Sequence, residues 1–334
     1  MVERLEKLSG LQIARAFAAL SIAYFHSWHV TMPFPPDTAH PIPLLKDYGW
    51  IAVDLFFAIS GFVICLVVTK PGFKPLQFLV RRAFRLYPLW IVTSIAMAYL
   101  FKRYLGWPPN ATIGFVAYSF TLLPTDGYPF YDLGWTLQHE LAFYVLAALI
   151  APRFGLVGLI TFLSVGFIMD HLVTLPWYLH QYAFYYPNFL AGVGAFLVYP
   201  HLKRLGFLAP LAVALGLLYL FAQTMGRIAF PVGLFFMLIA FVNIRLNPES
   251  IWERTGVLLG DASYSIYLIH PLVFYFVYAK LQPPLPPIWS QELLRFGSIA
   301  IVCLLAIASW KLFETRMISV GIRITSQPRK SVVH

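Results

Sequence analysis

The sequence predicts an all-α integral membrane protein, a bundle of about ten transmembrane helices with both termini in the cytoplasm. Composition is the first reason: 60% of the 334 residues are hydrophobic and 11% are charged, whereas a soluble domain is about half apolar and about a quarter charged. The mean hydropathy of +0.73 points the same way. Apolar runs long enough to cross a bilayer recur along the whole chain, which is typical of a polytopic protein.

Apolar runs of about 16–22 residues are the candidate membrane spans. We place them at 11–30, 48–69, 86–105, 136–151, 155–170, 178–199, 207–225, 228–244, 260–280 and 294–313. Stretches rich in proline separate several of them, because proline interrupts helices and favours turns. The run 111–123 is short and lies between Pro109 and Pro124, so we interpret it as an interfacial or re-entrant segment.

The basic residues predict the orientation of the spans. With the N-terminus inside, roughly three-quarters of the 24 Lys and Arg residues fall on the cytoplasmic face, in agreement with the positive-inside rule. The net charge of +10 is therefore explained by membrane orientation, and we expect no nucleic-acid partner. Cys65 and Cys303 lie in hydrophobic segments and indicate no disulfide framework. We expect a single polytopic domain over 1–320, followed by a cytoplasmic tail over 321–334.

The first span carries two polar residues inside an apolar run. Arg15 and His26 lie eleven positions apart, close to three whole helical turns, so both side chains leave the same face, roughly 16 Å apart along the axis. A charge in the middle of a membrane helix costs about 2.5–3.5 kcal/mol, which favours a functional role on this face. Two simpler interpretations remain: Arg15 could extend to the cytoplasmic headgroups, and His26 could be a buried histidine bonded to a carbonyl group.

Two carboxylates are predicted at the depth of His26. Asp54 lies near the outer end of the second span, and Glu140 lies at a similar depth in the fourth. A histidine and carboxylates at one membrane level form a candidate proton-handling site, because a neighbouring carboxylate holds the imidazole and supports its cationic form. The alternative for both carboxylates is a structural role, as hydrogen-bond partners of a serine or a backbone amide.

The cytoplasmic end of the third span carries three arginines in the segment VRRAFRLYP. Arg82 and Arg85 lie three positions apart on one helical face, and guanidinium groups bind phosphate oxygens through two hydrogen bonds at once, so the pair is a candidate phosphate clamp. We interpret Arg81 as a positive-inside anchor. His270 and Ser60, within the ninth and second spans, are interpreted as packing residues.

Several motifs, in order along the chain, carry a resemblance to a known family. They are Arg15-x10-His26, GWIAVDLFFAISGFVI, Arg82-x-x-Arg85, WTLQHELAFY and SYSIYLIHP, with LFETR as a weaker C-terminal match. The chain resembles the acyltransferase 3 family of bacterial membrane acyltransferases, which O-acylate surface glycans and other glycosylated acceptors. The resemblance extends from the first span through the ninth and implies a ten-helix membrane bundle.

The resemblance implies a donor and an acceptor. The donor would be a cytoplasmic acyl-CoA, most simply acetyl-CoA, whose nucleotide lies at Arg82 and Arg85 and whose pantetheine arm passes Arg15 to bring the thioester to His26. His26, oriented by Asp54 or Glu140, would then remove the proton from the acceptor hydroxyl group. A covalent acyl-histidine relay is the mechanistic alternative. The expected catalytic residues are therefore His26, Asp54 and Glu140, and the expected donor-binding residues are Arg15, Arg82 and Arg85.

We therefore expect an O-acetyltransferase of the bacterial plasma (inner) membrane that modifies a sugar hydroxyl of an exported or cell-surface polysaccharide and uses no metal. The expected partners are acyl-CoA, a glycan or lipid-linked saccharide, membrane lipids and polysaccharide-assembly proteins. Two alternatives stay open. A proton-coupled transporter of sugars or lipid-linked glycans also carries ionisable residues within its spans, although no paired halves are visible here. An acyltransferase acting on a small glycosylated acceptor also fits the sequence.

Overall fold

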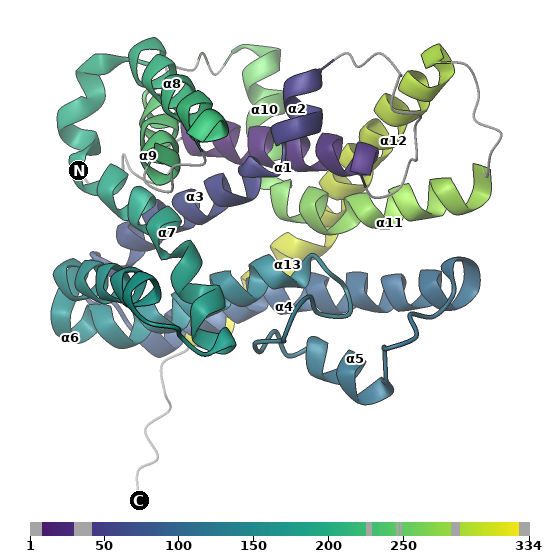
Figure 1. Ribbon diagram of the computed structural model, residues 1–334, viewed down its shortest axis with the longest axis horizontal. Coiled ribbons are helices and arrows are strands. Elements are labelled where there is room, and N and C mark those ends of the chain that lie inside the picture. Colours follow the sequence, from purple (N-terminus) through teal and green to yellow (C-terminus); the bar gives the residue numbers. More distant parts are fainter. Residues whose placement is uncertain are drawn as a thin grey trace, which may run out of the picture.

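The computed structural model describes residues 9–29, 42–224, 229–244, 247, 249–281 and 288–326, and within these residues it contains helices and no strands (Figure 1). The α-helices are α1 (Ser9–His29), α2 (Pro43–Tyr48), α3 (Ile51–Val68), α4 (Pro75–Leu100), α5 (Ile113–Ser119), α6 (Gly134–Leu172), α7 (Trp177–Leu202), α8 (Leu208–Thr224), α9 (Ala229–Val242), α10 (Ile251–Asp261), α11 (Ser263–Leu281), α12 (Ile288–Ser309) and α13 (Thr315–Ser326). The predicted all-α class is confirmed for this part of the chain.

Four described helical segments are long and apolar enough to cross a bilayer: Ile51–Val68, Pro75–Leu105, Gly134–Leu172 and Leu293–Ser326. The segments Ile251–Asp261 and Ser263–Val277 meet the same criterion as a pair, with a bend of 74° between them, and Leu208–Phe221 and Ala229–Val242 are shorter apolar helices. The chain is therefore a membrane protein. The total of ten spans and the cytoplasmic position of both termini stay predictions.

Two of the predicted spans, 136–151 and 155–170, correspond to the two helices that together make up the element α6 and meet at a kink. Its helical conformation is interrupted at Gly155, where φ is 61°, a conformation that glycine adopts without steric cost. The segment 111–123 contains only the seven-residue helix α5, and a transmembrane helix needs about 20 residues. That segment therefore does not cross the bilayer as a helix.

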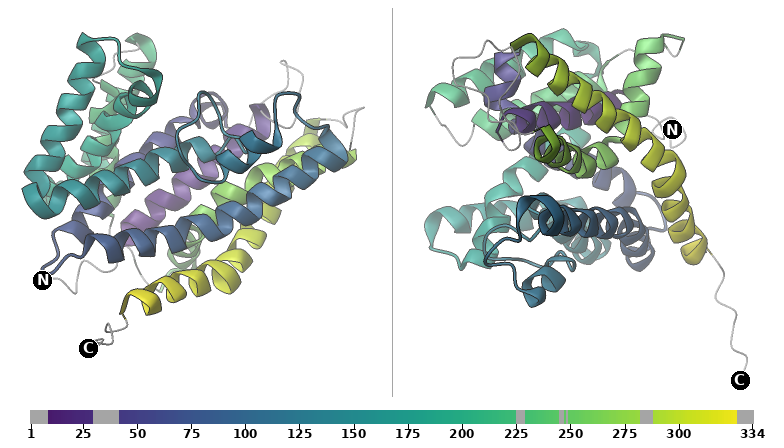
Figure 2. Two further views of the ribbon diagram at one scale, coloured as in Figure 1. Left: turned by 90° about the horizontal axis from the view of Figure 1, so that it is seen from below. Right: turned by 90° about the vertical axis from the view of Figure 1, so that its right-hand side faces the viewer.

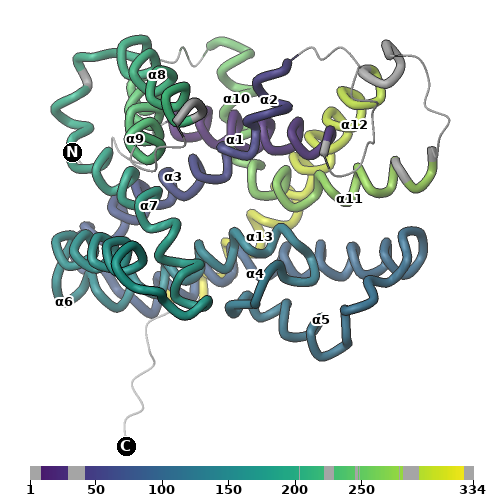
Figure 3. Tube along the Cα trace, viewed as in Figure 1, coloured from purple at the N-terminus to yellow at the C-terminus, as the bar shows by residue number. Residues whose placement is uncertain are grey.

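The helix that carries the first two polar residues lies inside the bundle. α1 packs against α3, α9, α10 and α11 (Figure 3). α3 also approaches α7 very closely: a Cβ atom added to Gly61 would lie 2.2 Å from the carbonyl oxygen of Phe189, and one added to Gly192 would lie 1.8 Å from that of Ala58. Such contacts between small residues let the backbones of membrane helices meet, and they fix how α3 is rotated relative to α7.

The C-terminal helix α13 lies along the N-terminal part of α4 (Figure 2). Arg81 Nε donates a hydrogen bond of 2.8 Å to Thr325 Oγ1, and Gly321 lies against the side chain of Phe84. α13 ends at Ser326, so a helix continues past residue 320, and the division into a domain and a cytoplasmic tail stays a prediction. This helix contributes a wall to the site described next.

Candidate active site

Three adjoining cavities lie between the helices that carry the predicted site residues. The basic cavity, lined in part by Lys70, Lys74, Arg81, Arg82 and Arg85, has a volume of about 420 Å³. The middle cavity, lined in part by Arg15, Arg82, Arg85 and Glu140, is narrow, at about 100 Å³. The histidine cavity, lined in part by His26, Asp54 and Asn188, has a volume of about 640 Å³. Arg82 and Arg85 line the first two cavities, and Val53 and Tyr267 line the last two.

All the ionisable residues that line the basic cavity are cations. They come from the turn after α3 and from the first turns of α4, while Ile318 and Ile322 of α13 close the opposite side. The hydrogen bond from Arg81 to Thr325 ties α4 to α13 at this point. Cations gathered on one wall attract an anion such as a phosphate group.

The middle cavity holds three arginines and one carboxylate. Glu140 Oε1 accepts hydrogen bonds from the hydroxyl groups of Ser60, at 3.2 Å, and Tyr144. The guanidinium of Arg82 lies over the ring of Tyr144, with Cζ 5.0 Å from the ring centre. Arg15 Nη1 donates a hydrogen bond of 3.3 Å to Gln12 of the same helix. These contacts fix the charged groups in the cavity wall before any ligand binds.

The wall of the histidine cavity is mostly aromatic, with Trp50, Trp135 and Tyr185 among its residues. Its two polar side chains from α3 and α7 are bonded to each other: Asn188 Nδ2 donates to Asp54 Oδ1 at 2.7 Å, and both residues are 5% exposed. A pocket with a large apolar wall and a few fixed polar groups is typical of a small-molecule site.

His26 contacts a second histidine in the structure. Its Nδ1 lies 2.7 Å from Nε2 of His270, which belongs to α11 and is fully buried. Sequence reasoning treated His270 as a packing residue because its partner lies 244 positions away in the chain. The only signal that singled it out was its place in the motif SYSIYLIHP.

The predicted site residues therefore separate into two groups. His26 and Asp54 line the histidine cavity, whereas Glu140 lines the middle cavity with Arg15, Arg82 and Arg85. The predicted depth of Glu140 resembles that of His26, but its side chain leaves α6 toward the arginines.

A family model described as an acyltransferase domain matches residues 8–310 of the chain. The chain belongs to this acyltransferase family. It is 27% identical over 280 residues to ORF330 of Acidianus two-tailed virus, a protein provisionally named an acetyltransferase, covering 78% of this chain and 81% of that protein. It is 28% identical over 249 residues to the exopolysaccharide production protein ExoZ of Rhizobium meliloti (strain 1021), covering 66% of this chain and 75% of ExoZ. No solved structure matched the chain.

The match confirms the resemblance that the ordered motifs indicated, and it identifies the chain as a membrane acyltransferase. An acyltransferase needs a place for an activated acyl donor, a place for an acceptor, and a base between them. The adjoining cavities offer a cationic end, a narrow passage and an aromatic chamber that contains an imidazole.

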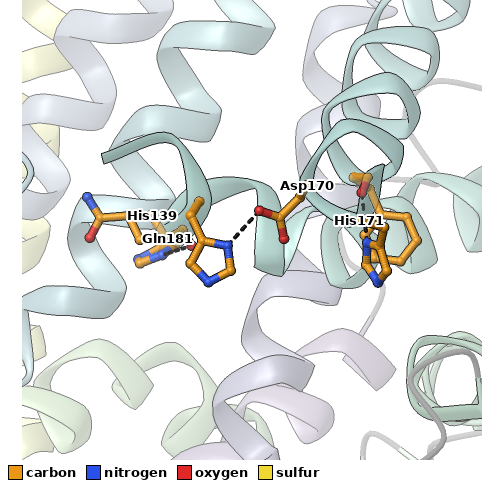
Figure 4. Close-up of polar contacts among 6 residues, drawn as sticks. His139, Asp170, His171 and Gln181 are labelled. Atoms are coloured by element: carbon orange, nitrogen blue, oxygen red, sulfur yellow. Dashed lines mark hydrogen bonds and ion pairs between the residues drawn. The ribbon is translucent and has the colours of Figure 1, made fainter. Parts of the chain in front are cut away.

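A further group of polar residues in this acyltransferase joins α6 to α7 (Figure 4). The ring nitrogens of His139 lie 2.6 Å from the Trp135 carbonyl oxygen and 2.9 Å from that of Gln181. His180 Nδ1 lies 2.5 Å from Asp170 Oδ1 at the turn between the two helices. The side chains of His139, Asp170 and His180 line none of the three cavities, and we assign these contacts a structural role.

Proposed function

We propose that this protein is an O-acetyltransferase of the bacterial plasma membrane that transfers an acetyl group from cytoplasmic acetyl-CoA to a sugar hydroxyl of an exported or cell-surface polysaccharide. The observation that carries the proposal is the row of adjoining cavities, with cations at one end and His26 at the other. The names of the two relatives, an acetyltransferase and an exopolysaccharide production protein, support the donor and acceptor classes.

The donor fits the cavities by charge and by width. The phosphorylated nucleotide of coenzyme A is anionic and suits the basic cavity, where Arg82 and Arg85 bind phosphate oxygens. The pantetheine arm is long and thin and suits the narrow middle cavity past Arg15. The distance of roughly 16 Å along α1 between Arg15 and His26 is the length over which the arm carries the thioester to the base.

The acceptor fits the histidine cavity by chemistry. A sugar ring has apolar C–H faces that pack on aromatic side chains, and Trp50, Trp135 and Tyr185 supply such surfaces. Its hydroxyl groups need hydrogen-bond partners, which the fixed pair of Asp54 and Asn188 provides. We therefore assign Asp54 to acceptor binding and Glu140 to holding the arginines of the donor passage.

The chemical step requires one proton transfer and one exchange of bonds. His26 takes the proton of the acceptor hydroxyl while its oxygen attacks the thioester carbonyl carbon, so a C–O bond forms. The C–S bond then breaks, and the departing thiolate of coenzyme A receives the proton from His26. The products are the O-acetylated sugar and coenzyme A with a free thiol group.

The direct test is the variant His26→Ala in detergent-solubilised, purified protein. We expect transfer of radiolabelled acetyl from acetyl-CoA to the glycan to fall by about 100-fold or more, the range for loss of a general base. The control is His201→Ala, because His201 is exposed at the end of α7 and lines none of the three cavities. Full activity of the His26 variant at normal protein levels would end the proposal.

The same assay separates the remaining alternatives. A sugar transporter would bind its cargo without transferring acetyl groups to it, so transfer by the solubilised protein excludes that class. Supplying a polysaccharide fragment and a small glycoside side by side tests the acceptor. Acetylation of the small glycoside alone would move the assignment to a small glycosylated acceptor and leave the acetyltransferase chemistry intact.

A further inference from the structure

Two histidines from different helices contact each other in the structure. His26 belongs to α1 and His270 to α11, and the 2.7 Å separation between Nδ1 of the first and Nε2 of the second is that of a hydrogen bond. Their ring planes differ by 21°. In such a bond one of the two nitrogens carries a hydrogen atom and donates it, and the other has a lone pair and accepts.

A backbone carbonyl group fixes the proton on His270. Its Nδ1 lies 3.1 Å from the carbonyl oxygen of Ile266, one turn earlier in α11. A carbonyl oxygen only accepts hydrogen bonds, so Nδ1 of His270 carries a hydrogen atom. In the neutral imidazole the lone pair then lies on Nε2, the atom that faces His26.

His270 is held in this neutral form by its surroundings. It is fully buried, and the polar and ring contacts found for it among the described residues include His26, the Ile266 carbonyl and the rings of Tyr267 and Phe274. None of these groups is an anion. A charged imidazolium at this position would lose its hydration without a compensating negative partner, which is costly.

We infer that His270 is a positioning residue that accepts a hydrogen bond from Nδ1–H of His26 and thereby keeps the lone pair of His26 on Nε2. The inference rests on the proposed role of His26 as the base. When Nε2 takes the acceptor proton, Nδ1–H of the resulting imidazolium still donates to His270, and hydrogen bonds from charged donors are the stronger ones. His270 thus fills the place that a carboxylate occupies in a Ser-His-Asp triad, whereas Asp54 is bonded to Asn188.

Three substitutions at position 270 separate hydrogen bonding from packing. In His270→Gln, the amide oxygen lies as many bonds from the backbone as Nε2 does, so it accepts the hydrogen bond from His26. In His270→Asn the oxygen is one bond too short, and in His270→Phe a ring of similar shape has no acceptor. We expect kcat to fall by about 100-fold or more in the Phe and Asn variants, the size of a general-base contribution, and to remain within about tenfold of wild type in the Gln variant.

The Michaelis constant for acetyl-CoA should stay unchanged in all three variants, because His270 does not line the basic or middle cavity. Thermal stability in detergent is measured alongside. Equal losses in the folded Gln and Phe variants, or full activity of the Phe variant, would overturn the inference and leave His270 a packing residue.

A spectroscopic measurement tests the proton position without using activity. With ¹⁵N-labelled histidine, the signal of His26 is identified by its absence in His26→Ala. We expect a protonated Nδ1 and an unprotonated Nε2 in the wild-type protein, and loss of this preference in His270→Phe. A protonated Nε2 in neutral His26 of the wild type would contradict the inference. An inactive wild-type protein with the expected spectrum would instead overturn the proposed function and leave the proton assignment standing.

Discussion

Asn188 of α7 donates a hydrogen bond of 2.7 Å to Asp54 of α3 in the wall of the histidine cavity. Both residues are 5% exposed, so the bond joins two buried polar groups within the membrane region. The close approach of the same two helices at Gly61 and Gly192 sets the geometry of this bond. The pair therefore connects the packing of the bundle to the chemistry of the cavity.

The first prediction is that the two partners of this bond are thermodynamically coupled. Asn188→Leu leaves the Asp54 carboxyl group buried without its partner, and an unsatisfied buried polar group costs about 1–3 kcal/mol. We expect a clear drop in the thermal unfolding temperature in detergent. The double variant Asp54→Leu with Asn188→Leu removes both groups and should recover stability. Strictly additive losses would show that the two residues act independently.

The second prediction concerns the arginine pair. Arg85→Ala should raise the dissociation constant for acetyl-CoA by about tenfold or more, because a hydrogen bond to a charged group contributes about 1.5–3 kcal/mol. Binding is measured by calorimetry on the purified protein. Arg323→Ala is the control, because Arg323 is exposed on α13 and does not line the basic cavity. An unchanged affinity of the Arg85 variant would refute the phosphate clamp.

The third prediction separates Glu140 from the chemical step. In Glu140→Gln the side chain keeps an oxygen for Ser60 and Tyr144 but loses the negative charge beside the arginines of the middle cavity. We expect the Michaelis constant for acetyl-CoA to change and kcat to stay within about tenfold of wild type. If kcat at saturating acetyl-CoA instead fell by about 100-fold or more, which is the effect of losing a general base, Glu140 would be a catalytic residue after all.

The fourth prediction tests the contact between α3 and α7. Gly61→Ala places a Cβ atom 2.2 Å from the Phe189 carbonyl oxygen, and overpacking of this kind costs about 1–3 kcal/mol. Gly216→Ala is the matched control, because no atom lies within 4 Å of a Cβ at that position in α8. Replacing glycine by alanine in an unobstructed helix stabilises by about 0.5–1 kcal/mol. The two variants should therefore shift the unfolding temperature in opposite directions.

Periodicity along the chain was enough to predict several features. Hydropathy predicted the all-α membrane class, and turn-forming residues located most helix boundaries, because both are local properties of short segments. Gly155 is one example: the hydropathy pattern indicated a separate helix on each side of it, and the helical conformation is interrupted at that residue. The grouping of Arg82 with Arg85 also followed from spacing alone, and both line the same two cavities.

The sequence by itself determined the membrane class, the family, and the shared helical face of Arg15 and His26, since each depends on residue types at fixed spacings along one chain segment. Only the tertiary structure decided that His26 meets His270 and that Glu140 joins the arginines. The rotation of each helix about its own axis is set by contacts with other helices, such as Gly61 against Phe189. Those contacts join residues far apart in sequence, so no local pattern encodes them.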